Sequence, residues 1–254
     1  WSSSLLVELA ERGAPVVLCA ANHAPKSVLM PLEGHRTQGA RMRAQWGAKK
    51  TMVKMAWKQV VIAKVRMQAA ALSAFGQPPA PLEMMVRKIT SGDKSNIEAQ
   101  AARYYWPLMM GGDFRRDASA GKENALLNYG YTILRAATAR AVVAAGLHPT
   151  IGLFHANRGN AFALADDLIE PFRPLVDCTV RSIVTSRGTE IDTKARHMLA
   201  ELIAIDLPLG NSITPVSVAL MKLATSLGQS FETGKLILAL PEPPGPLALA
   251  SLGR

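Results

Sequence analysis

Residues 50–81 read KTMVKMAWKQVVIAKVRMQAAALSAFGQPPAP, and this stretch decides the expected fold. Apolar side chains recur in it at the spacing of one helix face; they are Val53, Trp57, Val61, Val65 and Leu72. The helical composition begins near Thr37, and the run of glycine and proline at 76–81 cannot continue a helix. The sequence therefore predicts one long helix from Thr37 to about Phe75.

The chain on either side of this segment predicts a mainly α protein with a small β element at its start. Further helices are expected over residues 82–91, 95–110, 124–145, 160–169, 191–205 and 215–227. Before the long helix, residues 2–12 predict a short helix, and 16–20 and 28–32 predict strands. We expect the remnant of a β-rich domain at 1–33, an α-helical domain at 34–240, and a disordered proline-rich tail at 241–254.

Composition indicates a folded protein with an anionic partner. Lys and Arg number 29 against 19 Asp and Glu, the net charge is +10, and 49% of residues are apolar. No stretch is long and apolar enough to span a membrane, and no signal peptide is evident. Two cysteines, Cys19 and Cys178, cannot form a disulfide scaffold, so we expect a reduced, cytoplasmic protein. Because the chain starts at Trp1, we expect part of the N-terminus to be missing.

The positive charge is concentrated in one segment. Between Gly34 and Leu82 there is no acidic residue and there are nine basic ones: Arg36, Arg41, Arg43, Lys49, Lys50, Lys54, Lys58, Lys64 and Arg66. Lys50, Lys54 and Lys58 repeat every fourth residue and share one stripe of a helix. Such a segment repels itself unless an anion lies nearby, and nucleic-acid phosphate is the expected one. The alternative is a solvated helix face.

Three short segments could together hold a metal ion. Asp167 and Glu170 are three residues apart, so both carboxylates lie on one face of a helix. His155 lies in a short turn upstream, and Glu98 begins another helix. Two carboxylates and one imidazole suit Mg²⁺ or Mn²⁺ better than zinc, and such an ion could polarise a phosphodiester.

Each of these residues also has a purely structural interpretation. Residues 95–98 (SNIE) form a capping-box pattern, in which Glu98 would only satisfy a backbone N–H. His155 could be a core histidine, and Asp167 and Glu170 could be solvated or paired with Arg173. No phosphate-binding loop, G-x-G-x-x-G, C-x-x-C, H-E-x-x-H or G-x-S-x-G motif is present. The residues alone indicate an α-rich nucleic-acid-binding protein, with a metal site only suggested.

Four motifs in order resemble a known family. They are EAQAARYYW at 98–106, LNYGYTIL at 127–134, GLFH at 152–155 and DLIEPFRPLVD at 167–177. Together they resemble the CRISPR-associated adaptation integrase, in the form found beside single-protein effector nucleases. The resemblance runs from about Ser2 to Asp177, and it implies an α-helical catalytic domain.

The resemblance also implies the site residues. The family's metal-binding and catalytic positions fall on Glu98, His155 and Glu170, with Asp167 near the metal. Arg173 and residues 128–131 match positions around the active site. The basic residues are then a track for the DNA backbone, which gives position rather than sequence reading; they are Arg41, Arg43, Lys50, Lys54 and Lys58.

The implied activity is a Mg²⁺- or Mn²⁺-dependent DNA endonuclease and integrase of antiviral defence in prokaryotes. It inserts new spacers into a CRISPR array by attack of a DNA 3′-hydroxyl on a phosphodiester. The implied partners are double-stranded DNA (prespacer and repeat), a second copy of the chain and a small adaptation protein, with no membrane. Only the end of the family's N-terminal β-rich domain, which contributes dimer contacts, is present. Alternatives are a non-catalytic DNA-binding scaffold and a related transposon-borne integrase.

Overall fold

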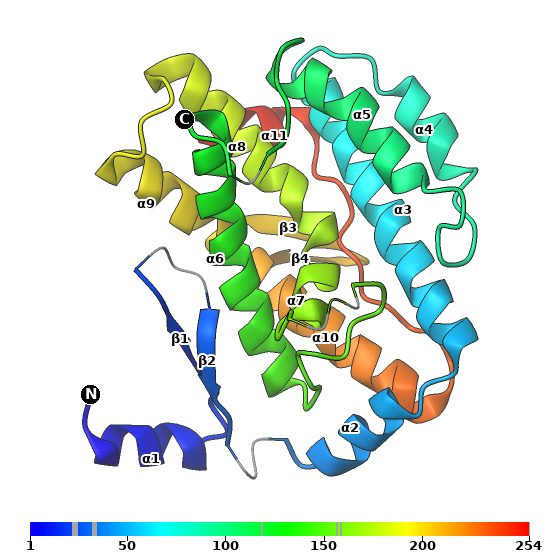
Figure 1. Cartoon of the computed structure of the whole chain (residues 1–254), viewed down its shortest axis with the longest axis vertical. Coiled ribbons are helices and arrows are strands. Elements are labelled where there is room, and N and C mark those ends of the chain that lie inside the picture. The colour runs from blue at the N-terminus through cyan, green and yellow to red at the C-terminus, as the bar shows by residue number, and fades with distance from the viewer. Residues whose placement is uncertain (22–24, 32–34, 118, 156, 158, 254) are drawn as a thin grey trace.

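Helices make up most of the protein, as the sequence predicts (Figure 1). The computed structural model describes residues 1–254 except 22–24, 32–34, 118, 156, 158 and 254. The central element is α3 (Lys50–Ala74), which contacts α4 (Ala80–Val86), α5 (Ile97–Met110) and α8 (Arg173–Arg187). From Ala56 onward α3 is buried on several sides, and the side chains inaccessible to solvent include Val60, Val61, Val65, Met67 and Leu72.

The predicted helix from Thr37 to Phe75 is wrong as one element. It is two helices, α2 (Gln38–Trp46) and α3, separated by residues 47–49. Gly47 follows the last turn of α2, and Lys49 has an extended backbone (φ −61°, ψ 132°). Glycine is a poor helix former, and α2 packs against α10 (Val216–Thr233) instead of continuing α3.

The remaining helices enclose the core beside α3. The segments predicted at 124–145 and 160–169 correspond to α6 (Glu123–Ala144) and the shorter α7 (Ala163–Leu168), which leads into the 3₁₀ turn η1 (Glu170–Phe172). Helices α6 and α8 pack closely at Gly130, because glycine has no side chain. A Cβ added there would lie 2.5 Å from a methyl group of Val176. This close approach aligns Tyr131 with Asp177, whose side chains hydrogen-bond in the core.

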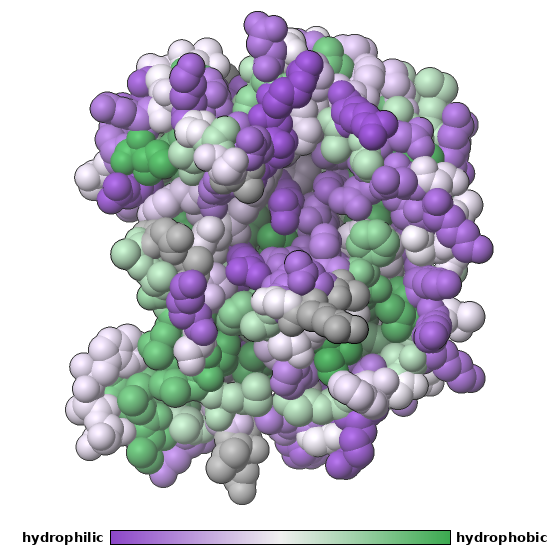
Figure 2. Space-filling view, viewed as in Figure 1, coloured by the Kyte–Doolittle hydropathy of each residue, from purple (hydrophilic) through white to green (hydrophobic). Residues whose placement is uncertain are grey.

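The N-terminal residues form a short helix and two strands, although the second strand begins three residues before its predicted start. Helix α1 (Ser3–Glu11) precedes an antiparallel hairpin of β1 (Val16–Cys19) and β2 (Pro25–Leu29), which contacts α6. Apolar side chains are exposed on this element, including Trp1, of which 85% is accessible. Figure 2 shows these apolar side chains gathered at one corner of the molecule.

The C-terminal third contains the helix predicted at 191–205, which is shorter than expected, and a hairpin and a final helix that the sequence did not predict. Helix α9 (Thr193–Glu201) and the turn η2 (Leu202–Ala204) precede a hairpin of β3 (Asp206–Leu209) and β4 (Ser212–Pro215), which turns at Gly210. The predicted disorder of residues 241–254 is wrong, because α11 (Pro246–Ser251) buries Leu249 against the core. Proline at the first position of a helix is compatible with its fixed φ. No helix in the described part of the chain is long and apolar enough to cross a membrane.

Candidate metal and DNA site

Two glutamates from distant parts of the chain meet at one lysine. The Nζ atom of Lys64, on α3, lies 2.5 Å from Oε1 of Glu98 on α5 and 2.5 Å from Oε2 of Glu170 on η1. Burial alone would lower the pKa of Lys64, but Glu170 and Glu98 raise it above its usual value. The two carboxylates predicted as metal ligands therefore share one positive charge.

Lys64 was missed as a site residue by the sequence analysis, which counted it only as part of the basic segment. Its signal was present, because it is a charged residue within an apolar stretch of the long helix. A buried charge requires a partner, and only the folded chain identifies the two carboxylates as that partner.

Glu98 is not held by a capping box. The backbone N–H groups of Ile97 and Glu98 donate to the carboxylate of Asp93, each at 2.9 Å. Asn96, at the start of the helix, has left-handed backbone angles and makes no side-chain cap. Because Asp93 supplies the cap, the Glu98 carboxylate extends to Lys64 instead.

Glu170 is the more buried of the two glutamates. Its side chain is 4% exposed, and Nε of Arg173 lies 3.0 Å from its Oε1. Burial alone would raise the pKa of Glu170, but Arg173 and Lys64 lower it below its usual value. Glu170 is thus paired with Arg173, as one of the structural interpretations proposed, and it remains ionised.

His155 is oriented by Asp167. Nδ1 of His155 lies 2.6 Å from Oδ1 of Asp167, which is fully buried on α7. The other carboxylate oxygen accepts the backbone N–H groups of Leu153 (2.5 Å) and Phe154 (3.0 Å). The hydrogen bond with Asp167 raises the pKa of His155, although burial opposes the shift. The imidazole is 42% exposed, so it is not a core histidine, and Nε2 is its ring nitrogen for a ligand.

Gly152 makes this arrangement possible. A Cβ at this position would lie 2.7 Å from both Oδ2 of Asp167 and the backbone oxygen of His155. Any side chain would therefore push the loop off the carboxylate that orients the imidazole. The same loop rests on α3, where the rings of Phe154 and Trp57 stack with centroids 4.6 Å apart and an interplanar angle of 2°.

A buried acid lies behind the glutamates. The hydroxyl groups of Tyr105 and Tyr131 donate to the carboxylate of Asp177. Burial raises the pKa of Asp177 to about 6, while the two tyrosine hydroxyls act in the opposite direction. The guanidinium of Arg173 lies 4.7 Å from the centre of the Tyr131 ring. Asp177 therefore supports the same arginine that pairs with Glu170, through the ring of Tyr131.

The chemical types of the predicted ligands, two carboxylates and an imidazole, suit a hard divalent cation, but the three groups are engaged with other partners. Oε2 of Glu170 is buried and accepts no well-aligned hydrogen bond, although it touches Lys64. Within the described residues, no group of three or more His, Cys, Asp or Glu is gathered closely enough to hold a metal. The glutamates contact the Lys64 ammonium, and the imidazole contacts Asp167. Carboxylate oxygens with an imidazole are ligands that Mg²⁺ and Mn²⁺ accept.

Four of the five basic residues predicted to contact DNA are at least partly accessible to solvent, and one is buried. Arg43, Lys50 and Lys54 are exposed, and Lys58 is half-buried. Arg41 is buried: its Nη1 donates to the backbone oxygen of Ala145 at 2.8 Å, and its Nε lies 3.1 Å from Glu232. The structure therefore removes Arg41 from the track, because its charge ties α2 to α10 and the end of α6.

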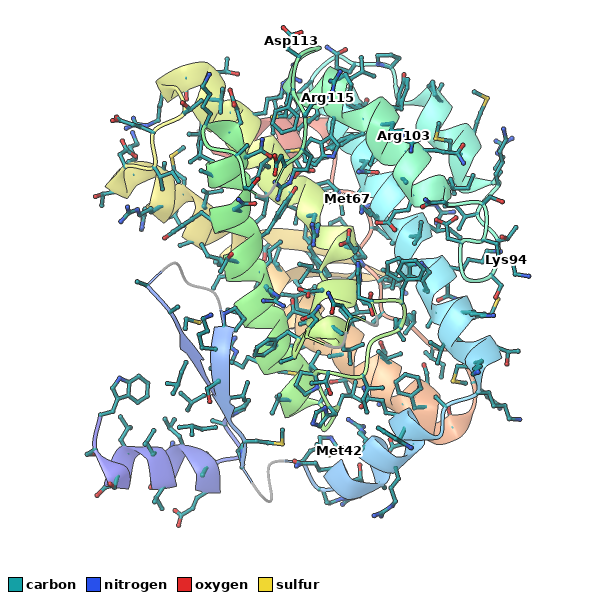
Figure 3. All side chains as sticks on the ribbon, in the orientation of Figure 1. Met42, Met67, Lys94, Arg103, Asp113 and Arg115 are labelled. Atoms are coloured by element: carbon teal, nitrogen blue, oxygen red, sulfur yellow. The ribbon has the colours of Figure 1, made fainter. Side chains whose placement is uncertain are left out.

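The structure also shows a second cationic region, which the sequence did not predict. A cavity of about 590 Å³ is lined by Arg103, Arg115 and Arg116 together with the aromatic rings of Trp106 and Phe114. Figure 3 shows Arg103 and Arg115 at the same end of the molecule. Arg116 also stacks over Tyr131, 5.3 Å from the ring centre, which joins this cavity to the Asp177 cluster. Figure 2 shows a recess lined by hydrophilic side chains on this face.

Comparison with known proteins gives named relatives. Residues 1–198 match the family described as CRISPR associated protein Cas1. CRISPR-associated endonuclease Cas1 of Neisseria meningitidis serogroup C is 37% identical over 181 residues, which cover 70% of this chain and 59% of that protein. CRISPR-associated endonuclease Cas1 1 of Archaeoglobus fulgidus is 34% identical over 122 residues, covering 42% and 35%. The chain thus spans less than two thirds of the length of these relatives.

Solved structures share the fold. A structure described as "Casposase bound to integration product" superposes with a TM-score of 0.75 at 20% identity, covering 94% of this chain and 77% of that one. One described as "Cas6-RT-Cas1--Cas2 complex" has a TM-score of 0.68 at 18% identity, covering 92% and 30%. The family match extends over most of the sequence, so the chain belongs to the CRISPR associated protein Cas1 family.

Proposed function

We propose that this chain carries the catalytic part of a metal-dependent DNA endonuclease and integrase that inserts new spacers into a CRISPR array. The observation that carries the proposal is the convergence of Glu98 and Glu170 on one positive charge, with Lys64 Nζ 2.5 Å from each. Relatives named CRISPR-associated endonuclease support the class of reaction. The reaction is attack of a DNA 3′-hydroxyl on a phosphodiester.

The proposed cofactor is Mg²⁺ or Mn²⁺, held by Glu98, Glu170 and the Nε2 atom of His155. When bound, the ion would polarise the phosphodiester and stabilise charge on its oxygens. Asp167 fixes the tautomer and direction of the imidazole through its 2.6 Å contact with Nδ1. Asp167 is therefore a positioning residue in this proposal, not a ligand.

The chain's own cations place the DNA. Exchange of one phosphodiester for another is nearly balanced in energy, so alignment and charge stabilisation carry the rate. Arg173 is held beside Glu170 and over Tyr131, which keeps a fixed guanidinium at the site. Exposed Lys50 and Lys54 supply contacts to the DNA backbone that give position without sequence reading.

The proposed partners are double-stranded DNA, a second copy of this chain and a small adaptation protein. Solved structures with the same fold include one described as a Cas1--Cas2 complex and one of a casposase bound to an integration product. The exposed apolar side chains of the N-terminal element support contact with a second copy. A transposon-borne integrase is the second candidate, since the casposase shares the fold.

An integration assay tests the proposal. The purified chain, with the small adaptation protein, is given Mn²⁺, a prespacer and a supercoiled plasmid that bears a repeat. Glu98→Gln, Glu170→Gln and His155→Ala should abolish strand transfer while duplex affinity is retained. Glu201→Gln is the control, because this glutamate is exposed on α9 and pairs with the exposed His197 of the same helix.

The outcomes separate the candidates. Strand transfer by Glu98→Gln at the wild-type rate would contradict the proposed metal site. If the protein binds duplex DNA but shows no Mn²⁺ binding that depends on the two glutamates, it is the non-catalytic DNA-binding scaffold. Integration that requires a transposon end, with none of a prespacer at the repeat, would favour the transposon-borne alternative.

A further inference from the structure

We propose that the outer face of Phe154 is a stacking platform for one nucleobase of the DNA strand that enters the site. The inference rests on the proposed function and goes beyond it, because it assigns a nucleobase subsite to a residue that holds no metal and no phosphate. Phe154 is 52% exposed although its ring is stacked in parallel on Trp57, which is 1% exposed. One face of the Phe154 ring is therefore covered, and the accessible area belongs to the other face and its edges.

The platform is rigid before any DNA binds. The backbone N–H groups of Phe154 and of Leu153 donate to the fully buried carboxylate of Asp167. The ring rests on an indole that belongs to the core helix α3, with centroids 4.6 Å apart. Preorganisation matters because a ring that is already fixed loses little conformational entropy when a base stacks on it.

The platform adjoins the proposed ligand His155. The two rings have centroids 5.7 Å apart and are nearly perpendicular, at 85°. This separation is less than two base steps of about 3.4 Å along one strand of a duplex. A base stacked on Phe154 would therefore belong to a nucleotide at or next to the reacting phosphate.

Two lysines on α3 lie near in sequence to the tryptophan that supports the platform. Trp57 lies between the exposed Lys54 and the half-buried Lys58, and neither lysine forms an ion pair with another residue in the described ranges. A cationic track that ends at an aromatic ring is the arrangement by which proteins bind single-stranded nucleic acid. Packing on Trp57 explains why one face of the Phe154 ring is covered, but it does not explain why the other face is exposed.

The test pairs changes in protein and DNA. Affinity for a fluorescently labelled single-stranded oligonucleotide is measured in EDTA, so neither metal nor strand transfer contributes. Phe154→Ala should weaken binding roughly 5- to 150-fold, from about 1–3 kcal/mol per stacked base. A single abasic site is then moved along the oligonucleotide. At one position it should lower the affinity of the wild type by the same factor, and at that position it should leave the affinity of Phe154→Ala unchanged.

Further variants separate stacking from folding. Phe154→Leu keeps an apolar contact with Trp57 but removes the aromatic face, so it should behave as Phe154→Ala does. Phe154→Tyr should bind as the wild type does. Ile213→Ala is the control, because Ile213 is 75% exposed on β4, away from α3. Melting temperatures of all variants show whether the loop change unfolds the protein.

Each result has a definite meaning. Equal costs of the abasic site in wild type and Phe154→Ala, at every position, would overturn the stacking platform while leaving the proposed integrase intact. Wild-type affinity in Phe154→Leu would overturn it as well. Absence of any oligonucleotide binding by the wild type would also overturn the stacking platform, while the integration assay alone would decide the proposed integrase. If Phe154→Ala and the abasic site are coupled in EDTA but integration fails, the stacking platform stands and only the proposed reaction is rejected.

Discussion

The imidazole of His155 lies 2.6 Å from the carboxylate of Asp167, which is completely buried and also accepts two backbone N–H groups of the same loop. One side chain therefore fixes both the conformation of the loop at 152–155 and the direction of the His155 imidazole. Outer contacts of this kind determine how well a ligand is presented to a metal.

Changing Asp167 should weaken metal binding without removing a ligand. Asp167→Asn keeps the shape of the side chain but loses the charge that orients Nδ1–H, so Mn²⁺ affinity should fall by about 10- to 100-fold. Isothermal titration measures the affinity. Asp166→Asn is the matched control, since Asp166 is adjacent and pairs with Arg135. Equal affinity of Asp167→Asn and wild type would contradict the positioning role.

Metal binding should rise with pH through the titration of His155. The pKa of His155 is raised, and a metal ligand must be the neutral imidazole, so protons compete with the ion below that pKa. Mn²⁺ affinity should therefore increase as pH rises through a midpoint above 6.5. Titrations at several pH values give the midpoint, and Asp167→Asn should move it downward. A pH-independent affinity would exclude His155 as a ligand.

Removing the ammonium between the glutamates should alter stability and metal response together. Lys64→Met leaves Glu98 and Glu170 without their shared positive charge, so the metal-free protein should lose about 3–5 kcal/mol. Mn²⁺ should raise the melting temperature of Lys64→Met more than that of wild type, because no ammonium competes with the ion. Lys58→Met is the control on the same helix. An equal Mn²⁺-dependent rise in both proteins would show that Lys64 does not compete.

Protonation of Asp177 should stabilise the fold in mild acid. Its pKa is about 6 in the folded protein against 3.8 for an unperturbed aspartate, so the folded state binds this proton more tightly. Its contribution to the free energy of unfolding should increase by about 2–3 kcal/mol as pH falls from 6 to 4. Asp177→Asn should lack this increase in urea denaturation, whereas the exposed Asp113→Asn should retain it. A difference between wild type and Asp177→Asn that is constant with pH would contradict the shift.

Salt dependence should separate the DNA track from Arg41. Lys50, Lys54 and Lys58 changed together to Ala should reduce the slope of log affinity against log salt by about 2–3 for duplex DNA. Arg41→Ala should leave that slope unchanged and lower stability, because Arg41 is paired with Glu232 and the backbone of Ala145. An unchanged slope in the triple variant would identify the stripe as a solvated face.

The sequence by itself determined the mainly α class, because helical spacing and proline breaks are local properties of the chain. It also indicated the basic segment, since residues 34–82 contain no acid. The family resemblance placed candidate ligands at Glu98, His155 and Glu170. Local pattern failed where tertiary contacts decide the outcome: the break between α2 and α3, and the tail helix that buries Leu249.

Only the tertiary structure showed which charges meet. Glu98 and Glu170 are 72 positions apart in the sequence, and nothing local states that both reach Lys64. Arg41 and Arg43 look alike in the sequence, yet packing of α2 on α10 buries one and exposes the other. The physical reason is that burial and pairing depend on contacts between distant segments, whereas helix formation depends on neighbours a few residues away.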